Sequence, residues 1–359
     1  MPEKYSHHMI KEIYEEPNIV KKTIDEEKDN AKNIAQEIKS KGYEMIYITG
    51  SGTSYHAGLA SQYALSNLTN IATSIIPASE FQRWVPVKIS RKVLLMAISQ
   101  SGESSDVIQA ARAALDRKMA LLAVTNTLGS KLAEMSDYHL LSRSGHEEAV
   151  PATKTYVAQL ISIFMLSVEL AIGTINPQEL IQIRNGLYTT PQLIQKMLRS
   201  LNTQIEGMAE QYRDKNFMFL LGSGPDYATA LEGALKLKET CTIFAEGFAT
   251  REFLHGPMRL IDERTLVTMM VSQDEIDTYM ELGNSFHGFG APIIAISEDT
   301  INHAELRKFS NYIIPVPRGL PKVFSPLLNV VPLQLFAYYS SLFRGLNPDK
   351  PEKITKVVK

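Results

Sequence analysis

The strongest constraint in this sequence is a glycine-rich turn that occurs twice, nearly a whole domain length apart. Gly50–Gly52 and Gly222–Gly224 each follow a short apolar run, and the offset between them is 172 residues (222 − 50). Two later pairs keep almost the same spacing: Ser99 with Ser272, at an offset of 173, and Tyr138 with Tyr312, at an offset of 174. One match can arise by chance, but three at a nearly constant offset predict two copies of one structural unit.

Within the first copy, short apolar runs alternate with segments that are long enough to form a helix. The apolar runs cover residues 45–49, 71–77, 93–99 and 121–125. Strands that alternate with helices are typical of a parallel sheet with helices on both faces. The sequence therefore predicts an α/β fold made of two doubly wound parallel sheets.

The same pattern predicts where the parts of the chain begin and end. Residues 1–40 are predicted to form an N-terminal helical segment with one buried stripe, because apolar residues recur there at helical spacing among many lysines and glutamates. The first unit is predicted over 41–195 and the second over 196–345. A basic tail, 346–359, ends the chain.

Composition excludes several classes of protein. The chain has 359 residues, of which 44% are hydrophobic and 21% charged, as expected for a globular protein with a large core. Lys and Arg (37) do not exceed Asp and Glu (39), so the sequence gives no electrostatic basis for binding nucleic acid. No apolar run approaches the ~20 residues that cross a bilayer. Because Cys241 is the only cysteine, no intramolecular disulfide can form, and we expect a cytoplasmic protein.

A serine-rich loop follows the predicted strand at 93–99. In the sequence Ser99-Gln100-Ser101-Gly102-Glu103-Ser104-Ser105, backbone N–H groups and hydroxyls converge where the next helix begins. Such a helix end attracts anions. Thr53 and Ser54 follow the first strand and are expected at the same edge of the sheet, where ligands of parallel sheets bind. The sequence predicts a phosphate site here; the alternative is that Ser104 or Ser105 only caps a helix.

The glycine turns do not match a nucleotide-binding motif. In a dinucleotide fingerprint a third glycine lets the helix pack closely on the strand, but Tyr55 and Tyr227 stand at that place. The glycine-lysine loop of ATPases is missing, and no pair of the eight histidines has the spacing of a zinc-binding HExxH motif. We therefore expect no cofactor and no metal.

A second group of reactive side chains lies in the second copy. Residues 230–239 are predicted to form a helix in which Glu232, Lys236 and Glu239 share one face, and His255 follows within two dozen residues. A carboxylate, an amine and an imidazole are the groups that move protons next to a carbonyl. The alternative is a solvated Glu–Lys pair that contributes only a few tenths of a kcal/mol.

Taken together, these motifs resemble the isomerase half of glucosamine-6-phosphate synthase, a pair of sugar isomerase (SIS) domains, and stand-alone relatives such as archaeal glucosamine-6-phosphate deaminases. The resemblance extends over essentially the whole chain, from His8 to Lys356. The motifs that carry it are at residues 52–54, 99–103, 153–154, 230–239 and 255–257. It implies two tandem SIS domains, each with a flavodoxin-like α/β fold.

The resemblance implies that a hexose 6-phosphate is the substrate. The residues that would hold its phosphate are Thr53, Ser99, Gln100, Ser101 and Ser104. Further substrate-binding positions would be Ser54, Val150, Ala152 and Glu232. Ala152 stands where the synthase has a serine, so one sugar hydroxyl would lack that partner.

The resemblance also implies a catalytic role for four residues. Glu239 would carry a proton between C1 and C2 of the sugar, and Lys236 would stabilise charge that develops on oxygen. Lys356 would form a Schiff base with the ketose carbonyl, which makes 346–359 an active-site tail. His255 would act in ring opening and would come from the neighbouring subunit of a homodimer.

The nitrogen source and the direction of the reaction stay open. The sequence contains no counterpart of the synthase's glutaminase domain, so we expect a deaminase, or an aminotransferase that uses ammonia from solution or from a separate glutaminase subunit. One alternative is a deglycase that cleaves fructosamine 6-phosphates. A second is a regulator without catalysis that only binds a sugar phosphate, although such a protein would not need the acid–base groups.

Overall fold

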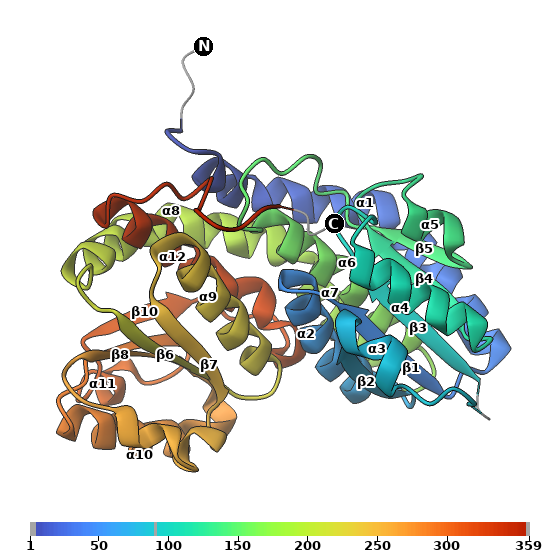
Figure 1. The fold of residues 1–359 in the computed structure, drawn as a ribbon. Helices are drawn as coiled ribbons and strands as arrows, with labels where there is room; N and C mark the ends of the chain where they lie inside the picture. Colours follow the sequence, from blue (N-terminus) through green and yellow to red (C-terminus); the bar gives the residue numbers. More distant parts are fainter. Residues whose placement is uncertain (1–4, 90–91, 357–359) are drawn as a thin grey trace.

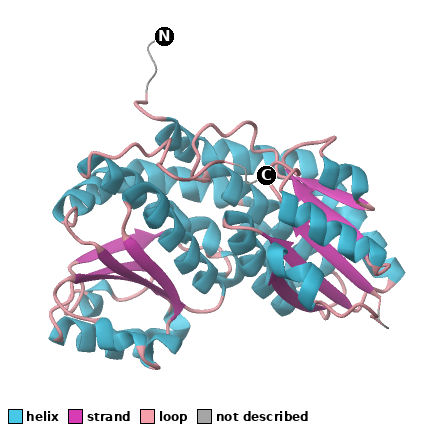
Figure 2. Ribbon diagram, viewed as in Figure 1, coloured by secondary structure: helices cyan, strands magenta, loops and turns pink. Residues whose placement is uncertain are grey.

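The computed structural model describes residues 5–89 and 92–356, so the predictions for the two ends of the chain are tested only inside these ranges. It contains two α/β units, each built on a parallel sheet of five strands (Figure 1, Figure 2). The first sheet has the order β2-β1-β3-β4-β5, and the second has the order β7-β6-β8-β9-β10. The two orders are equivalent and are those of flavodoxin-like folds, as predicted.

β1 to β4 match the four predicted apolar runs to within about two residues, which is the usual uncertainty of such boundaries. In the first sheet they are β1 (Met45–Gly50), β2 (Ala72–Pro77), β3 (Val93–Ile98), β4 (Ala120–Thr125) and β5 (Tyr138–Leu141). In the second they are β6 (Phe217–Gly222), β7 (Phe244–Ala249), β8 (Thr265–Val271), β9 (Ile293–Glu298) and β10 (Tyr312–Val316). The first residues of β1 and β6 differ by 172, and those of β5 and β10 by 174, so the predicted repeat is confirmed.

Helices cover both faces of each sheet (Figure 2). The first unit contains α2 (Thr53–Leu68), α3 (Ala78–Trp84), α4 (Ser105–Asp116), α5 (Lys131–Met135) and α6 (Lys154–Leu170). The α-helices of the second part of the chain are α7 (Pro177–Tyr188), α8 (Thr190–Gln211), α9 (Pro225–Cys241), α10 (Ile276–Gly288), α11 (His303–Leu306) and α12 (Pro326–Phe343). Short 3-10 helices are η1 (Glu252–Leu254), η2 (Pro257–Leu260), η3 (Gln273–Glu275) and η4 (Lys322–Phe324).

The predicted N-terminal helical segment is a single helix of 34 residues, α1 (His8–Lys41), with Pro17 in its interior. It packs against α6 and α8 and lies along one side of both units (Figure 1). Its buried stripe contains the expected isoleucines, but it also contains the carboxyl side chains of Glu12 and Glu16. Both carboxyl groups lie near Glu147, a residue of the functional site described below.

The two units meet through α2 and α9, the helices that follow the two glycine turns. α12 packs on α8 and α9, and the chain then returns from the second unit toward the first as the tail 346–356 (Figure 1). α8 runs through the predicted boundary between residues 195 and 196, and the domain limits stay a prediction. Among the helices in the described ranges, we find none with the length and apolar character needed to span a membrane.

Candidate active site

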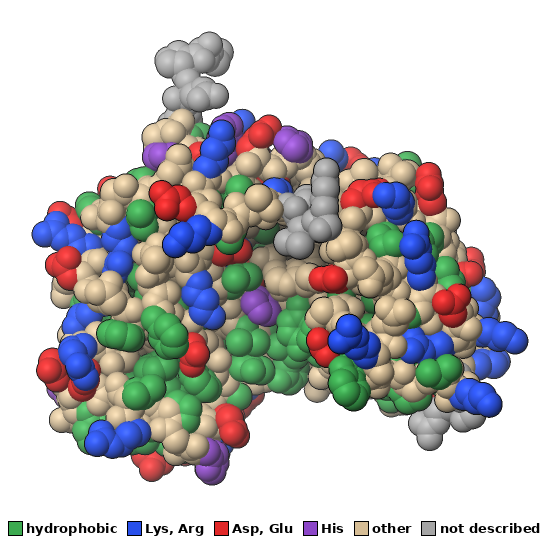
Figure 3. Space-filling model, in the orientation of Figure 1, with side chains coloured by type: hydrophobic (Ala, Val, Ile, Leu, Met, Phe, Trp, Pro, Cys, Tyr) green, Lys and Arg blue, Asp and Glu red, His purple; other side chains and the backbone are tan. Residues whose placement is uncertain are grey.

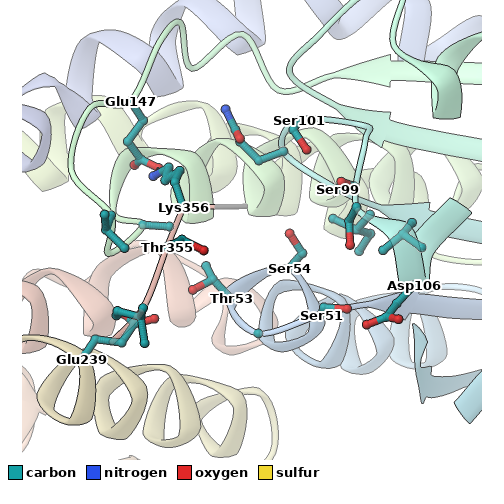
Figure 4. Close-up of a pocket in the computed structure, with 18 of the residues that line it drawn as sticks. Ser51, Thr53, Ser54, Ser99, Ser101, Asp106, Glu147, Glu239, Thr355 and Lys356 are labelled. Carbon is teal, nitrogen blue, oxygen red and sulfur yellow. The ribbon is translucent and has the colours of Figure 1, made fainter. Parts of the chain in front are cut away.

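A pocket of about 450 Å³ lies at the carboxyl end of the first sheet, bounded on one side by α9 and the C-terminal tail (Figure 4). Ten of the thirteen predicted site residues line it: Thr53, Ser54, Ser99, Gln100, Ser101, Ser104, Val150, Ala152, Glu239 and Lys356. These residues come from five separate segments of the chain. The fold therefore brings most of the predicted site into one place.

The serine-rich loop forms one wall of the pocket between β3 and α4. Ser99 Oγ accepts a hydrogen bond from the backbone N–H of Gly102 at 3.1 Å, which fixes the loop as a tight turn. Gly102 has a φ of +66°, and a Cβ at this position would lie 2.1 Å from Ser130 Oγ, so only glycine fits. α4 begins at Ser105 and directs the positive end of its dipole toward this wall. The serine loop and the start of α4 thus lie together at this wall, and anion binding by them stays a prediction.

The start of α2 forms the neighbouring wall. Gly52 takes a φ of +54°, and α2 begins at Thr53 directly after it. The hydroxyl groups of Ser54 and Ser99 both lie along the pocket in Figure 4. Ser54 Oγ also accepts a hydrogen bond from the buried side chain of Gln159 on α6, at 3.0 Å. The hydroxyls at this edge are therefore held by the surrounding helices.

Three charged residues share one face of α9, as the helical spacing predicts. Lys236 Nζ lies 2.6 Å from Glu239 Oε2 and 3.3 Å from Glu232 Oε1. The side chains of Lys236 and Glu232 are 0% and 1% exposed, whereas that of Glu239 is 21% exposed and reaches the pocket. The alternative of a solvated Glu–Lys pair is wrong, because α2 and α9 bury this face against each other.

Glu232 and Lys236 also form hydrogen bonds and ion pairs that connect the second unit to the first. Thr53 Oγ1 donates to Glu232 Oε1 at 3.0 Å and accepts from Lys236 Nζ at 3.2 Å. His56, one turn further along α2, places Nδ1 2.8 Å from Glu232 Oε2. The sequence analysis did not identify His56, since a lone histidine in a helix gives no signal of its partner. Glu232 and Lys236 lie behind the pocket wall, in contact with the residues that form it.

Neighbouring charges determine the pKa values of Lys236 and Glu232 on α9. Burial alone would lower the pKa of Lys236, but Glu232 and Glu239 outweigh burial and raise that pKa well above its usual value. Burial would likewise raise the pKa of Glu232, yet Lys236 and His56 hold it below the usual value. The site therefore holds the Lys236 cation beside the Glu232 carboxylate.

The C-terminal tail brings Lys356 into the same pocket. Its Nζ donates hydrogen bonds to Glu147 Oε2 at 2.6 Å and to the carbonyl oxygen of Ala149 at 2.7 Å (Figure 4). The carbonyl oxygen of Asp349 accepts a hydrogen bond from Val150 N, which fastens the start of the tail to the same loop. The prediction that the tail belongs to the site agrees with this geometry, while the chemical role of Lys356 stays a prediction.

Glu147 was missed by the sequence analysis. Its side chain is 0% exposed, and Oε1 accepts hydrogen bonds from the backbone N–H groups of Thr153 and Thr155. Burial would raise the pKa of Glu147, but Lys356 and these hydrogen bonds hold it below the usual value. The loop that carries Glu147 has no periodic pattern, so only its position just before the motif at 153–154 could have drawn attention to it.

Glu12 approaches the same loop from α1. Its carboxyl group accepts hydrogen bonds from the backbone N–H groups of Glu148 and Ala149, at 2.5 and 3.4 Å. Burial, together with the nearby charge of Glu147, raises the pKa of Glu12 to about 7. Lys154, whose Nζ lies 2.7 Å from Glu15 Oε2, stands beside it. The side chains of Glu12, Glu15, Lys154 and Lys356 thus lie around the loop that carries Glu147.

His255 is not among the residues that line this pocket. It lies at an exposed turn between η1 and η2 in the second unit, and two neighbouring apolar side chains, Leu254 and Leu260, are 39% and 61% exposed. A role for His255 in a neighbouring subunit stays a prediction. Other pocket residues that the sequence analysis did not single out are Ser51, Asp106, Val107, Lys353, Ile354 and Thr355.

Within residues 5–89 and 92–356, no group of three or more His, Cys, Asp or Glu side chains is arranged to hold a metal ion. The pocket instead offers hydroxyls, backbone N–H groups at a helix end, the carboxyl groups of Asp106, Glu147 and Glu239, and the amines of Lys353 and Lys356. Such a set can bind an anionic group at one end and exchange protons at the other.

Comparison with known proteins agrees with this architecture. The family model of the SIS domain matches residues 38–168 and 211–344. The chain is 36% identical over 365 residues to the glutamine–fructose-6-phosphate aminotransferase [isomerizing] of Clostridium tetani, covering 99% of this chain and 59% of that protein. It is 38% identical to the protein of the same name from Methanothermobacter thermautotrophicus, again over 99% of this chain, and spans 58% of it.

A solved structure supports the same relationship. The C-terminal domain of glucosamine-fructose-6-phosphate aminotransferase from Francisella tularensis superimposes with a TM-score of 0.90 at 28% identity, covering 98% of this chain and 99% of that one. The chain thus spans somewhat under two thirds of the curated relatives but the whole of this solved domain. With two matching regions over two equivalent sheets, it belongs to the SIS-domain family and contains the domain twice.

Proposed function

We propose that this chain interconverts fructose 6-phosphate and glucosamine 6-phosphate, moving hydrogen between C1 and C2 of the sugar while nitrogen enters or leaves. The observation that carries the proposal is the composition of one pocket. An anion-binding serine loop forms one wall, and Glu239 and Lys356 lie on the α9 and tail side (Figure 4). A hexose phosphate has an anion at C6 and its reacting carbons at C1 and C2, so it can occupy both parts at once.

The phosphate is held by the loop between β3 and α4 and by the start of α2. The side chains of Ser99, Ser101 and Ser104 and the N-terminal end of α4 supply hydrogen-bond donors and positive potential. Thr53 and Gln100 complete this group. Binding through the phosphate, which takes no part in the reaction, orients the sugar for the chemistry at its other end.

Glu239 is the proton carrier between C1 and C2. It is the member of the α9 group that reaches the pocket, and Lys236 holds its carboxylate from behind. An enediol or enolamine intermediate develops negative charge on oxygen, and the fixed Lys236 cation stabilises it. Lys356 attacks the ketose carbonyl as an amine and forms the Schiff base through which nitrogen is exchanged.

His255 acts from a second copy of the chain in a homodimer. His255 does not line the pocket of its own chain, and it lies on an exposed turn flanked by exposed leucines. On the face drawn in Figure 3, hydrophobic side chains gather in the hollow between the two units, as expected for a surface that another chain covers. Within the partner's pocket an imidazole would supply the acid–base step of ring opening.

Ammonia is the nitrogen that this site exchanges. It is either released from glucosamine 6-phosphate, as in a deaminase, or taken up by fructose 6-phosphate from solution or from a separate glutaminase subunit. The residues described here provide the sugar site and the lysine but no thiol at the pocket, since the single cysteine, Cys241, is buried in α9. An unpaired, buried cysteine is also compatible with a cytoplasmic location.

The test is product analysis with purified protein. Ammonia release from glucosamine 6-phosphate, or its formation from fructose 6-phosphate and ammonium, supports the proposal. Cleavage of fructoselysine 6-phosphate without either reaction would instead identify a deglycase. Saturable binding of these sugars with no turnover of any of them would identify a regulator and contradict the proposal.

A further inference from the structure

The ammonium group of Lys356 rests against a buried carboxylate. Its Nζ donates to Glu147 Oε2 at 2.6 Å and to the carbonyl oxygen of Ala149 at 2.7 Å. A carbonyl oxygen cannot take up a proton at neutral pH, whereas a carboxylate can. Glu147 also lines the sugar pocket, although it comes from a part of the chain 209 residues away from the tail.

A lysine in this state is a cation and cannot attack a carbonyl until it loses a proton. Resting on the function proposed above, we propose that Glu147 is a catalytic residue, which accepts one proton from Lys356 and later returns it to the oxygen that leaves the sugar. Glu147 and Glu239 then have separate tasks: Glu147 serves the nitrogen chemistry at Lys356, and Glu239 serves the hydrogen transfer between C1 and C2.

The step balances with no other reactant. One proton passes from the Lys356 ammonium to Glu147, and the free amine forms a C–N bond to C2 of the open-chain ketose while the C=O electron pair moves to oxygen. A second proton passes from nitrogen to that oxygen and gives a carbinolamine. Glu147 then donates its proton to the hydroxyl, which leaves as water. The product is a protonated Schiff base, and Glu147 is again a carboxylate.

The groups around Glu147 act on its proton affinity in both directions. The charged and titratable groups that face it are Glu12 and Glu16 from α1 and Lys356 from the tail, and Lys154 from α6 lies 4.0 Å from Glu12. Burial and the two carboxyl groups on α1 favour the neutral acid, whereas Lys356 and the hydrogen bonds from the backbone N–H groups of Thr153 and Thr155 favour the carboxylate. Lys356 is the main opposing charge, so the basicity of Glu147 increases as that lysine gives up its proton.

The rate of Schiff-base formation tests the inference. Protein is mixed with fructose 6-phosphate, quenched with borohydride at set times, and the adduct on Lys356 is measured by mass spectrometry. We expect Glu147→Gln to slow adduct formation at least ~10-fold at pH 7. The deficit should narrow toward pH 9, where solvent can remove the proton, and fructose 6-phosphate affinity should be nearly unchanged.

The matched control is Glu148→Gln, one residue away, whose side chain is 56% exposed beside His146. It should form the adduct at the wild-type rate. Glu147→Asp keeps a carboxylate, and at pH 7 it should recover part of the rate that Glu147→Gln loses, with the remaining deficit narrowing toward pH 9. If Glu147→Gln folds poorly, this second variant carries the test, and an Asp variant as slow at pH 9 as at pH 7 would show a structural role and overturn the inference.

The remaining outcomes separate this inference from the proposed function. Adduct formation by Glu147→Gln at the wild-type rate would overturn the inference and leave the function intact. Turnover by wild-type protein with no adduct would contradict the roles of both Lys356 and Glu147. A wild-type protein that forms neither adduct nor product would contradict the proposed function itself.

Discussion

Lys236 Nζ lies 2.6 Å from Glu239 Oε2, one turn further along α9, and the lysine side chain is fully buried. This contact holds the Glu239 carboxylate at the pocket wall. The second carboxylate beside Lys236, that of Glu232, lies behind the wall. A proton carrier needs such a fixed position, because small displacements of a reacting group reduce the rate strongly.

The first prediction concerns the stability that depends on Lys236. Lys236→Met leaves the carboxylate of Glu232, which is 1% exposed, without its buried counter-charge. Loss of one partner from such a pair costs about 3–5 kcal/mol of unfolding free energy. Lys238→Met, on the exposed side of the same helix, should change it by less than about 0.5 kcal/mol. Urea unfolding of both variants measures the difference, and equal values would show that the buried group is not needed for stability.

The second prediction concerns the phosphate loop. Gly102→Ala places a Cβ 2.1 Å from Ser130 Oγ and forces the loop to move. We expect the dissociation constant for fructose 6-phosphate to rise at least ~10-fold, the loss of about one hydrogen bond to a charged group. Gly129→Ala is the control, since Gly129 also has a positive φ, +82°, but nothing lies within 4 Å of its Cβ. Calorimetric titration compares the two, and an equal effect on affinity would remove the loop from the phosphate site.

The third prediction concerns pH. Burial raises the pKa of Glu12 from 4.5 to about 7, so the folded protein binds this proton more tightly than the unfolded chain does. The stability contributed by Glu12 is therefore complete below pH 4.5 and is lost as the pH rises through 7. Glu12→Gln removes this titration. The free energy of unfolding of the variant, relative to wild type, should therefore increase by about 2.5 kcal/mol between pH 5 and pH 8.

Denaturant unfolding at several pH values measures that difference. Titration of Asp226 and the other carboxyl groups is common to both proteins and cancels in the comparison. Parallel stability profiles for wild type and Glu12→Gln would mean that Glu12 titrates normally in the folded state.

Much of the fold was accessible from the sequence because its signals are local and repeated. The apolar runs predicted the strands, and the offset between Gly50–Gly52 and Gly222–Gly224 predicted a second copy of the sheet, which the equivalent strand orders confirm. The common face of Glu232, Lys236 and Glu239 followed from helical spacing alone.

Contacts between distant segments could not be predicted from such local patterns. Nothing in the loop around Glu147 indicates that Lys356 will reach it, because the contact depends on the path of the tail after α12. Glu12 looks like an ordinary exposed residue of an amphipathic helix, and it becomes buried only because α6 and the loop before it cover that part of α1. The roles of both residues therefore required the tertiary structure.

The fourth prediction tests the homodimer. We expect His255→Asn and Glu239→Gln each to be inactive alone. A mixture that has exchanged subunits should regain about a quarter of wild-type activity, because half of the dimers are mixed and each mixed dimer has one intact site. No recovery after confirmed subunit exchange would show that His255 and Glu239 must belong to the same chain.

The role of Glu239 is tested most directly by following hydrogen at the reacting carbons of the sugar. Wild-type protein, Glu239→Gln and the exposed control Glu210→Gln are incubated with glucosamine 6-phosphate in D₂O, and exchange at C2 is followed by NMR. We predict that exchange falls at least ~100-fold in Glu239→Gln alone, while affinity for the sugar phosphate is nearly unchanged. Exchange at the wild-type rate in Glu239→Gln, or an equal loss of exchange and affinity, would contradict this role.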